Sequence, residues 1–223
     1  MALKTNRKVL LHYHEPNSQV CEEFEYIKQN IEFLSYERGC STILVTSPEA
    51  GDGKSSIAAN LAISLAQTGK KVLLIDSHIK KPSVQSLFGF KNTAGLVNIL
   101  SDQKTLEETI NKTPIENLKV LTSGPLPYDT AKLLKSSKMD DLLKKASFQF
   151  AYVVIDSPSI LEDSTAKILS AKCDGSILVV KNGKTEDAIA LEAKNALELS
   201  NARILGIIFN RKKKRFSFKR GTK

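Results

Sequence analysis

The chain has 223 residues, of which 41% are hydrophobic, and its formal net charge at pH 7 is +9. A chain of this length can bury a sizeable core without disulfides, and its apolar runs are shorter than the roughly 18 residues that span a bilayer. The N-terminal apolar stretch is too short for a signal peptide, so we expect a cytoplasmic protein. Cys21, Cys40 and Cys173 lack the spacing of a metal site or disulfide framework, which favours buried, reduced thiols.

The positive charge is concentrated at the C-terminus. Residues 211–223 read RKKKRFSFKRGTK and contain eight Lys or Arg and no acid, so the rest of the chain is close to neutral. This distribution argues against a basic nucleic-acid-binding face on the body of the protein. We expect a disordered basic tail that is either merely solvated or binds an anionic membrane surface or an acidic partner.

Helices and strands are expected to alternate after an irregular N-terminal segment, residues 1–20. The first helix, 21–37, carries an apolar stripe formed by Phe24, Ile27, Ile31 and Leu34. Strands are expected at 41–47, 72–76, 118–124, 152–158, 175–181 and 204–210, and helices at about 55–69, 138–148 and 185–200, the last capped by Thr185. Short, continuously apolar strands are typical of a parallel sheet covered on both faces. The pattern predicts one doubly wound α/β domain with a mainly parallel sheet, residues 21–210, followed by the tail, 211–223.

The stretch TSPEAGDGKSS, residues 46–56, joins an expected strand to an expected helix. A tight loop that leads into a helix binds phosphate through its backbone N–H groups and the helix dipole. Lys54, which we expect to be exposed, offers a positive charge to the terminal phosphates, and Ser55 offers a hydroxyl ligand to Mg²⁺. The alternative, a turn with an incidental lysine, does not account for the strand before the loop and the helix after it. The predicted nucleotide-binding residues of this loop are Gly51, Asp52, Gly53, Lys54, Ser55 and Ser56.

Two acids stand at the ends of apolar strands. Asp76 ends VLLID and Asp156 ends YVVID, so in a parallel sheet both carboxylates lie at the edge that holds the phosphate loop. Mg²⁺ bound by phosphates and one hydroxyl needs nearby carboxylates, directly or through water. Taken alone, either acid is as compatible with the N-cap of a helix as with a metal site. Their shared position at strand ends favours a magnesium site formed by Ser55, Asp76 and Asp156.

Four ordered segments of the chain resemble the bacterial tyrosine kinases that accompany capsule and exopolysaccharide synthesis. This family belongs to the same P-loop NTPase branch as the division-site and partitioning ATPases. The loop SPEAGDGKSSIAANLA opens with a proline and has an acid before Gly-Lys, as in these kinases, and VLLIDSHIKKP matches their strand followed by Asp-x-Asp-x-Arg/Lys and proline. The other two segments are LKVLTSGPLPYDTAKLLKSSKMDDLL and FAYVVIDSPSILEDSTAKILSAKCDGSILVVKNGKT, and the resemblance covers about residues 20–210.

The resemblance implies a stand-alone cytoplasmic kinase that transfers the γ-phosphoryl group of Mg-ATP to protein tyrosines and regulates polysaccharide synthesis and export. Its catalytic residues would be Lys54, Asp76 and Asp156. Asn210 would contact adenine, although a polar residue that merely ends its strand is an equal alternative. The implied partners are a membrane-anchored polysaccharide co-polymerase or activator subunit, protein tyrosine substrates and further copies of the chain, with no nucleic acid.

Three features depart from the family pattern. The second acid of Asp-x-Asp is His78 here, which removes a negative charge from the site. Glu25 and Lys28 stand where the N-terminal helix of these kinases has arginines that join subunits into a ring, and the charge reversal at Glu25 disfavours that contact. The C-terminal tyrosine cluster is absent, since the tyrosines of this chain are Tyr13, Tyr26, Tyr36, Tyr128 and Tyr152.

Two alternative functions remain. A catalytically weak nucleotide switch that acts as a scaffold of the polysaccharide assembly machinery is favoured by His78 and by the missing tail tyrosines. A membrane-cycling partitioning ATPase would use the basic tail, but its loop has an early lysine where this chain has Glu49. In those ATPases the lysine reaches the partner's nucleotide across a dimer, so Glu49 disfavours this class.

Overall fold

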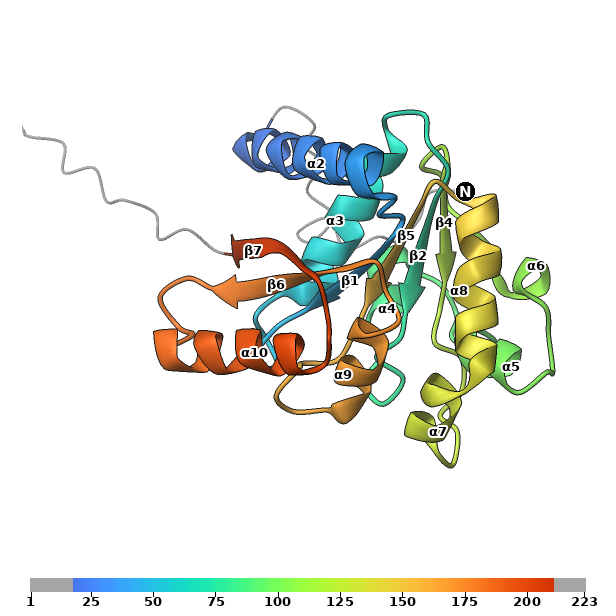
Figure 1. Cartoon of the computed structure of the whole chain (residues 1–223). Helices are drawn as coiled ribbons and strands as arrows, with labels where there is room; N and C mark the ends of the chain where they lie inside the picture. Colours follow the sequence, from blue (N-terminus) through green and yellow to red (C-terminus); the bar gives the residue numbers. More distant parts are fainter. Residues whose placement is uncertain (1–17, 211–223) are drawn as a thin grey trace, which may run out of the picture.

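Strands are connected mostly through helices along residues 18–210, the part of the chain that this computed structural model describes (Figure 1). The strands are β1 (Thr42–Thr46), β2 (Val72–Asp76), β3 (Asn111–Lys112), β4 (Leu118–Leu121), β5 (Tyr152–Asp156), β6 (Gly175–Lys181) and β7 (Ile204–Asn210). The helices are α2 (Gln19–Arg38), α3 (Lys54–Ala66), α4 (Val84–Phe88), α5 (Leu96–Leu100), α6 (Leu106–Thr109), α7 (Thr130–Lys135), α8 (Ser137–Gln149), α9 (Ser164–Ser170) and α10 (Asp187–Leu199). The tail, 211–223, and most of the expected N-terminal segment lie outside the described residues.

All seven strands form a single sheet in the order β3-β4-β2-β5-β1-β6-β7. Every pairing is parallel except that of β3 with β4. The order places β5 between β2 and β1, so the carboxyl ends of these three strands meet at one edge of the sheet. The predicted doubly wound, mainly parallel α/β fold of a P-loop NTPase is confirmed.

Some element boundaries differ from expectation for local reasons. β4 ends at Leu121, not at residue 124, because the carbonyl of Thr122 accepts a hydrogen bond from the N–H of Leu96. The prediction that Thr185 caps α10 is wrong, because its hydroxyl accepts a hydrogen bond from the N–H of Lys181 and the helix begins one residue after Glu186. The two-residue strand β3 was not expected, since two residues show no periodicity.

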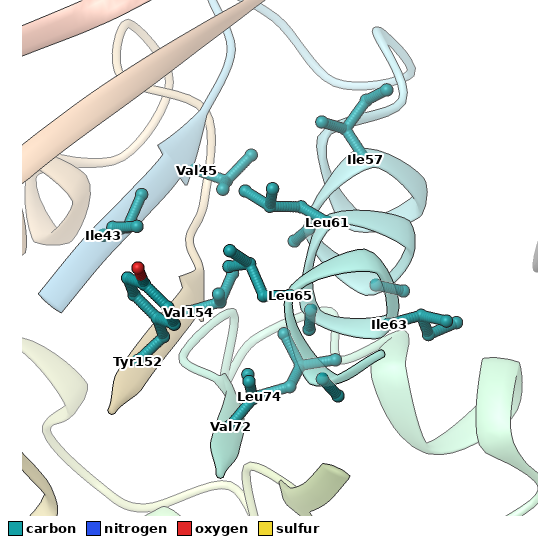
Figure 2. Packing of buried hydrophobic residues seen from close by; sticks show 14 of the residues in the cluster. Ile43, Val45, Ile57, Leu61, Ile63, Leu65, Val72, Leu74, Tyr152 and Val154 are labelled. Atoms are coloured by element: carbon teal, nitrogen blue, oxygen red, sulfur yellow. The ribbon is translucent and has the colours of Figure 1, made fainter. Parts of the chain in front are cut away.

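One face of the sheet is covered by α2, α3 and α4. Figure 2 shows side chains of α3 against β1, β2 and β5, among them Leu61 and Leu65 beside Val45 and Val154. Nearly every residue of α3 is buried, so the helix that follows the phosphate loop is packed into the core. Burial of this kind contributes roughly 25 cal/mol for each Å² of apolar surface removed from water and fixes the loop at the end of the helix.

The opposite face of the sheet packs against the remaining helices. The alternate residues of the central strands, such as Leu73 and Ile155, join side chains of α5 to α9 in a second cluster. Residues of β6 and α10, including Leu178 and Leu197, form a third. Side chains of consecutive strand residues point to opposite faces, which explains why these strands are apolar throughout.

The N-terminal helix α2 uses its predicted apolar stripe. Phe24 and Ile31 are buried against α3 and the sheet, and Ile27 is half-buried beside them. Glu25 forms an ion pair with Lys28 one turn later, so each neutralises the other within the helix. Within residues 18–210 no helix combines the length and the apolar character needed to cross a membrane.

The cysteines are free thiols, as expected. Cys21 and Cys40 are buried, whereas Cys173 is partly exposed. Burial is the first cause that raises the pKa of the Cys40 thiol to about 11. A thiol with a raised pKa carries little thiolate at neutral pH and is unreactive, in agreement with a structural role.

Candidate functional site

The loop between β1 and α3 has the backbone that phosphate binding requires. Gly51 and Gly53 have φ angles of 85° and 97°, in the left-handed region that favours glycine. Among the described residues, none accepts a hydrogen bond from the backbone N–H groups of residues 51–56. These donors lie at the N-terminus of a 13-residue helix, where the helix dipole also favours an anion. The loop is therefore a ready site for a phosphate group.

Gly53 is required for a second reason, which involves Asn210 at the end of β7. The side-chain amide of Asn210 donates a hydrogen bond of 2.7 Å to the carbonyl of Asp52. A Cβ atom on Gly53 would lie 2.1 Å from the Nδ2 atom of Asn210. Asn210 therefore supports the phosphate loop directly, and its contact with adenine stays a prediction.

Two side chains that were not singled out from the sequence hold the same loop. A carboxylate oxygen of Glu162 accepts a 3.1 Å hydrogen bond from the N–H of Ala50. The ammonium of Lys181 donates to the carbonyl of Gly51 at 3.1 Å. Lys181 ends β6 and Glu162 follows β5, so the rule that ligands gather at the carboxyl ends of parallel strands would have pointed to both.

The acid that precedes Gly-Lys faces inward. The Asp52 side chain is buried, and one of its carboxylate oxygens accepts a 3.3 Å hydrogen bond from the N–H of Glu49. The other has no hydrogen-bond partner among the described residues. The neighbouring Pro48 is also buried, whereas Glu49 is exposed. Asp52 therefore orders the turn, and Glu49 stands outside it.

Lys54 is buried at the first position of α3, so the expectation of an exposed lysine is wrong. Only 5% of this residue is exposed, and nearly all the residues that follow it in α3 are buried as well. Its positive charge lowers the pKa of Asp76, of Asp156 and of His78, although burial is the larger influence on all three. The lysine thus supplies the positive charge of a site whose acids are buried beside it.

Asp76 and Asp156 are directly opposite each other on β2 and β5, and both are fully buried. Asp76 accepts hydrogen bonds from the backbone N–H groups of His78, Ser83 and Val84 at 2.9 to 3.0 Å. Burial raises the pKa of Asp76, and these three bonds oppose the shift. The arrangement fixes the orientation of the Asp76 carboxylate.

Asp156 has no such support. Both of its carboxylate oxygens are buried and receive no hydrogen bond of ordinary geometry from residues 18–210. Burial, followed by the charge of Asp76, raises the pKa of Asp156 to about 8, while the Ser55 hydroxyl and Lys54 oppose the shift from nearby. A buried carboxylate without partners is unfavourable unless a cation joins it, so this position fits a metal ligand.

The donor set agrees with the predicted Mg²⁺ site. Hard oxygen donors are what Mg²⁺ prefers, and it is usually held by one or two carboxylates together with substrate phosphates. Among residues 18–210, no group of three or more His, Cys, Asp or Glu side chains is arranged to hold a metal on its own. Two carboxylates and the Ser55 hydroxyl therefore fit an ion that also binds the phosphates of a nucleotide.

His78, which replaces the second acid, is half-buried beside this pair. Burial lowers the pKa of its imidazole to about 4, and the charge of Lys54 acts in the same direction. The imidazole is therefore neutral at physiological pH. The backbone N–H of His78 donates a hydrogen bond to the Asp76 carboxylate, but the His78 side chain brings no charge to the site.

Comparisons with known proteins identify the family of this chain. A family model described as "ParA: NUBPL iron-transfer P-loop NTPase" matches residues 40–217. Tyrosine-protein kinase YwqD of Bacillus subtilis is 41% identical over 96% of this chain and 92% of its own length. Tyrosine-protein kinase CpsD of Streptococcus agalactiae is 34% identical over 85% of this chain and 82% of its own. The crystal structure of the chimerical protein CapA2B2 aligns with a TM-score of 0.89 at 32% identity, over 94% of this chain and 92% of that one. The chain therefore belongs to the bacterial tyrosine-protein kinases, within the ParA-like P-loop NTPases.

Proposed function

We propose that this chain transfers the γ-phosphoryl group of Mg-ATP to protein tyrosines and thereby regulates the synthesis and export of capsular or extracellular polysaccharide. The observation that carries the proposal is the buried carboxylate of Asp156, which receives no hydrogen bond of ordinary geometry within the described part of the chain. It lies opposite Asp76 and close to Lys54 of the phosphate loop. Family membership supplies the tyrosine as acceptor.

Each residue then has a defined task. The free backbone N–H groups of residues 51–56, which include Gly51, Asp52, Gly53 and Ser56, bind the phosphate oxygens, and the Lys54 ammonium stabilises the charge that develops on them. Ser55, Asp76 and Asp156 would hold Mg²⁺, which would neutralise charge on the phosphates. Asp76, fixed by three backbone bonds, also accepts the proton of the attacking tyrosine hydroxyl.

Incubation of the purified protein with γ-labelled ATP tests this function, with and without the cytoplasmic segment of a candidate membrane partner. The proposal expects label on tyrosine that increases when the segment is added. Nucleotide binding without any label on tyrosine, in both conditions, would instead support the weak switch or scaffold, which the neutral imidazole of His78 favours. The exposed Glu49 in place of the early lysine disfavours a partitioning ATPase.

Replacing His78 with aspartate should increase the rate of phosphoryl transfer. The substitution restores a carboxyl group where the imidazole is uncharged at neutral pH, and Lys54 favours its ionised form. Steady-state transfer to a tyrosine peptide checks this, with His78→Asn as the uncharged control of similar size. A rate for the aspartate variant no higher than that of the asparagine variant would show that position 78 does not limit the reaction.

A membrane-anchored activator subunit is the proposed partner. The structural similarity to a chimerical protein, CapA2B2, supports a kinase that works together with a second polypeptide. Contacts between copies of the chain are also proposed. In α2, however, Glu25 and Lys28 pair with each other, so neither charge is free for the contact that joins subunits of related kinases into a ring. We propose a cytoplasmic kinase domain, residues 21–210, that reaches the membrane through this partner.

The basic tail, 211–223, lies outside the described residues, and we propose that it binds anionic lipid. Truncation after Asn210 should abolish co-sedimentation with vesicles that contain phosphatidylserine. For the full chain this binding should weaken as salt is added, because charges on a solvated segment are screened beyond about 10 Å at 0.1 M salt. Equal co-sedimentation of the full and truncated chains would show that the tail is merely solvated.

A further inference from the structure

We propose that Tyr128 is the tyrosine of this chain that a second copy of the same chain phosphorylates. This inference rests on the proposed kinase function and adds the acceptor. The basic tail, whose aromatic residues are Phe216 and Phe218, offers no tyrosine hydroxyl. An acceptor within the chain must therefore lie elsewhere.

Exposure and backbone separate the described tyrosines. Tyr152 is 1% exposed within β5 and is inaccessible. Tyr26 and Tyr36 are exposed, but both lie within the 20-residue helix α2, whose other face is packed into the core. A helix is about 10 Å wide, so it cannot enter a cleft as an extended peptide without unfolding. Tyr128 is fully exposed and lies outside any helix or strand.

The segment that carries Tyr128, residues 125–129, is a loop with bends at Pro125 and Tyr128 and with both ends fixed. Leu126 precedes Pro127, and a residue before proline is restricted to extended backbone. At the start of the loop, the N–H of Gly124 donates to the side chain of Asn92 at 2.8 Å. At its end, Asp129 accepts a 2.9 Å hydrogen bond from the N–H of Lys132 and caps α7. The loop therefore presents its tyrosine without any local unfolding.

This loop lies on the same edge of the sheet as the phosphate loop. It follows the carboxyl end of β4, and the helix after it, α7, packs against α9 (Figure 1). The residues just before α9 reach the active site: Glu162 bonds the N–H of Ala50, and Asp163 forms a 2.8 Å ion pair with Lys80. Two copies that approach each other through this edge in a symmetric contact would each bring Tyr128 towards the other's site.

A second exposed apolar side chain supports such a contact. Leu126, at 68% exposure, lies two residues before Tyr128 on the same loop. An apolar pair on a fixed loop is a suitable docking element for another protein surface. The loop thus combines the acceptor hydroxyl with a means of binding.

The chemical step is the phosphoryl transfer already proposed for this site. The hydroxyl oxygen of Tyr128 forms a bond to the γ-phosphorus of ATP in the other copy, and the bond from that phosphorus to the bridging oxygen of ADP breaks. The hydroxyl proton passes to the Asp76 carboxylate of the donor copy and then to solvent. The products are ADP, one proton and phosphotyrosine, which adds roughly 1.5 to 2 negative charges to the loop.

A mixing experiment tests the proposal. Wild-type protein serves as the donor. A tagged Lys54→Met protein, which should bind ATP much more weakly, serves as the acceptor together with Mg-ATP. We expect mass spectrometry to find phosphate on Tyr128 of the tagged chain, and Lys54→Met/Tyr128→Phe to lose most of this label. The matched controls Lys54→Met/Tyr26→Phe and Lys54→Met/Tyr36→Phe should keep it.

Transfer to an added copolymer of glutamate and tyrosine separates the two proposals. Tyr128→Phe in the otherwise wild-type chain should still label the copolymer, because Tyr128 is an acceptor and takes no part in binding ATP. Label on Tyr13, Tyr26 or Tyr36 in place of Tyr128, or a labelled copolymer with an unlabelled chain, overturns the assignment of Tyr128 alone. If neither the copolymer nor the chain is labelled, the kinase function fails as well.

Discussion

Replacing Lys54 with methionine should abolish most ATP binding and leave the fold intact. Methionine keeps the length and apolar stem of this buried side chain, so the packing at the start of α3 is retained. The lost ammonium removes a charged contact to phosphate. Contacts of this kind contribute about 1.5 to 3 kcal/mol, so we expect affinity to fall by up to a factor on the order of a hundred.

Calorimetric titration with Mg-ATP measures this effect, and circular dichroism checks the fold. Lys70→Met is the matched control, because Lys70 is a more exposed lysine that pairs with Glu32 at 3.2 Å and lies outside the phosphate loop. It should bind ATP like the wild type. Equal affinity of wild type and Lys54→Met would contradict the assignment of residues 46–56 as the phosphate loop.

Replacing Asp156 with asparagine should have two opposite effects: loss of magnesium-dependent phosphoryl transfer and a more stable protein in the absence of nucleotide. Transfer is lost because an amide is a poor ligand for Mg²⁺ in place of a carboxylate. Stability rises because the substitution removes a buried carboxylate that has no hydrogen-bond partner. Such an exchange of function for stability is expected where a site holds an unfavourable charge for its ligand.

The pH dependence gives the sign of the stability effect. The pKa of Asp156 is raised to about 8 in the folded state, first by burial and then by Asp76, so between pH 4 and 8 the folded state binds a proton that the unfolded state has released. The stability that protonation of Asp156 contributes to the wild type is therefore present below pH 4 and is lost as the pH rises towards 8. Over this pH range, the difference in the free energy of unfolding between Asp156→Asn and the wild type should grow to on the order of a few kcal/mol.

Urea unfolding at several pH values without magnesium or nucleotide measures this difference. Asp174→Asn is a control with the opposite sign, because Asp174 accepts hydrogen bonds from the N–H groups of Ser41 and Thr42. Although burial raises the pKa of Asp174, those bonds outweigh it and lower the pKa overall, so the asparagine variant should be less stable at neutral pH. A difference between Asp156→Asn and wild type that does not change with pH would refute the raised pKa.

The fold and the positions of Asp76 and Asp156 at strand ends were predictable because local sequence patterns indicate them. The strands that end in Asp76 and Asp156 are short and apolar throughout. The predicted strand 72–76 matches β2, whereas β5 ends at Asp156, two residues before the predicted end at 158. That the two acids face each other required β2 to lie beside β5, an order that no local pattern contains. The burial of Lys54 was missed for the same reason, since it depends on how α3 packs against the sheet.

The supports of the phosphate loop depend on contacts between distant parts of the chain. Lys181 and Gly51 are 130 residues apart in sequence, and Glu162 and Ala50 are 112 apart. Pairings across such distances follow from the tertiary structure, so spacing alone does not identify them. Asn210 was predicted from family resemblance as an adenine contact, and its bond to Asp52 adds a role in holding the loop.

The ratio of phosphotyrosine formed to ADP released is the most direct measure of the central claim. Purified protein, with its activating partner segment, would be incubated with Mg-ATP and a tyrosine peptide, and both products would be quantified over time. A kinase that uses Lys54, Asp76 and Asp156 for transfer should form phosphotyrosine and ADP in nearly equal amounts, and Asp156→Asn should form neither. Steady release of ADP without phosphotyrosine, by a protein that binds ATP well, would contradict the kinase function and favour the switch.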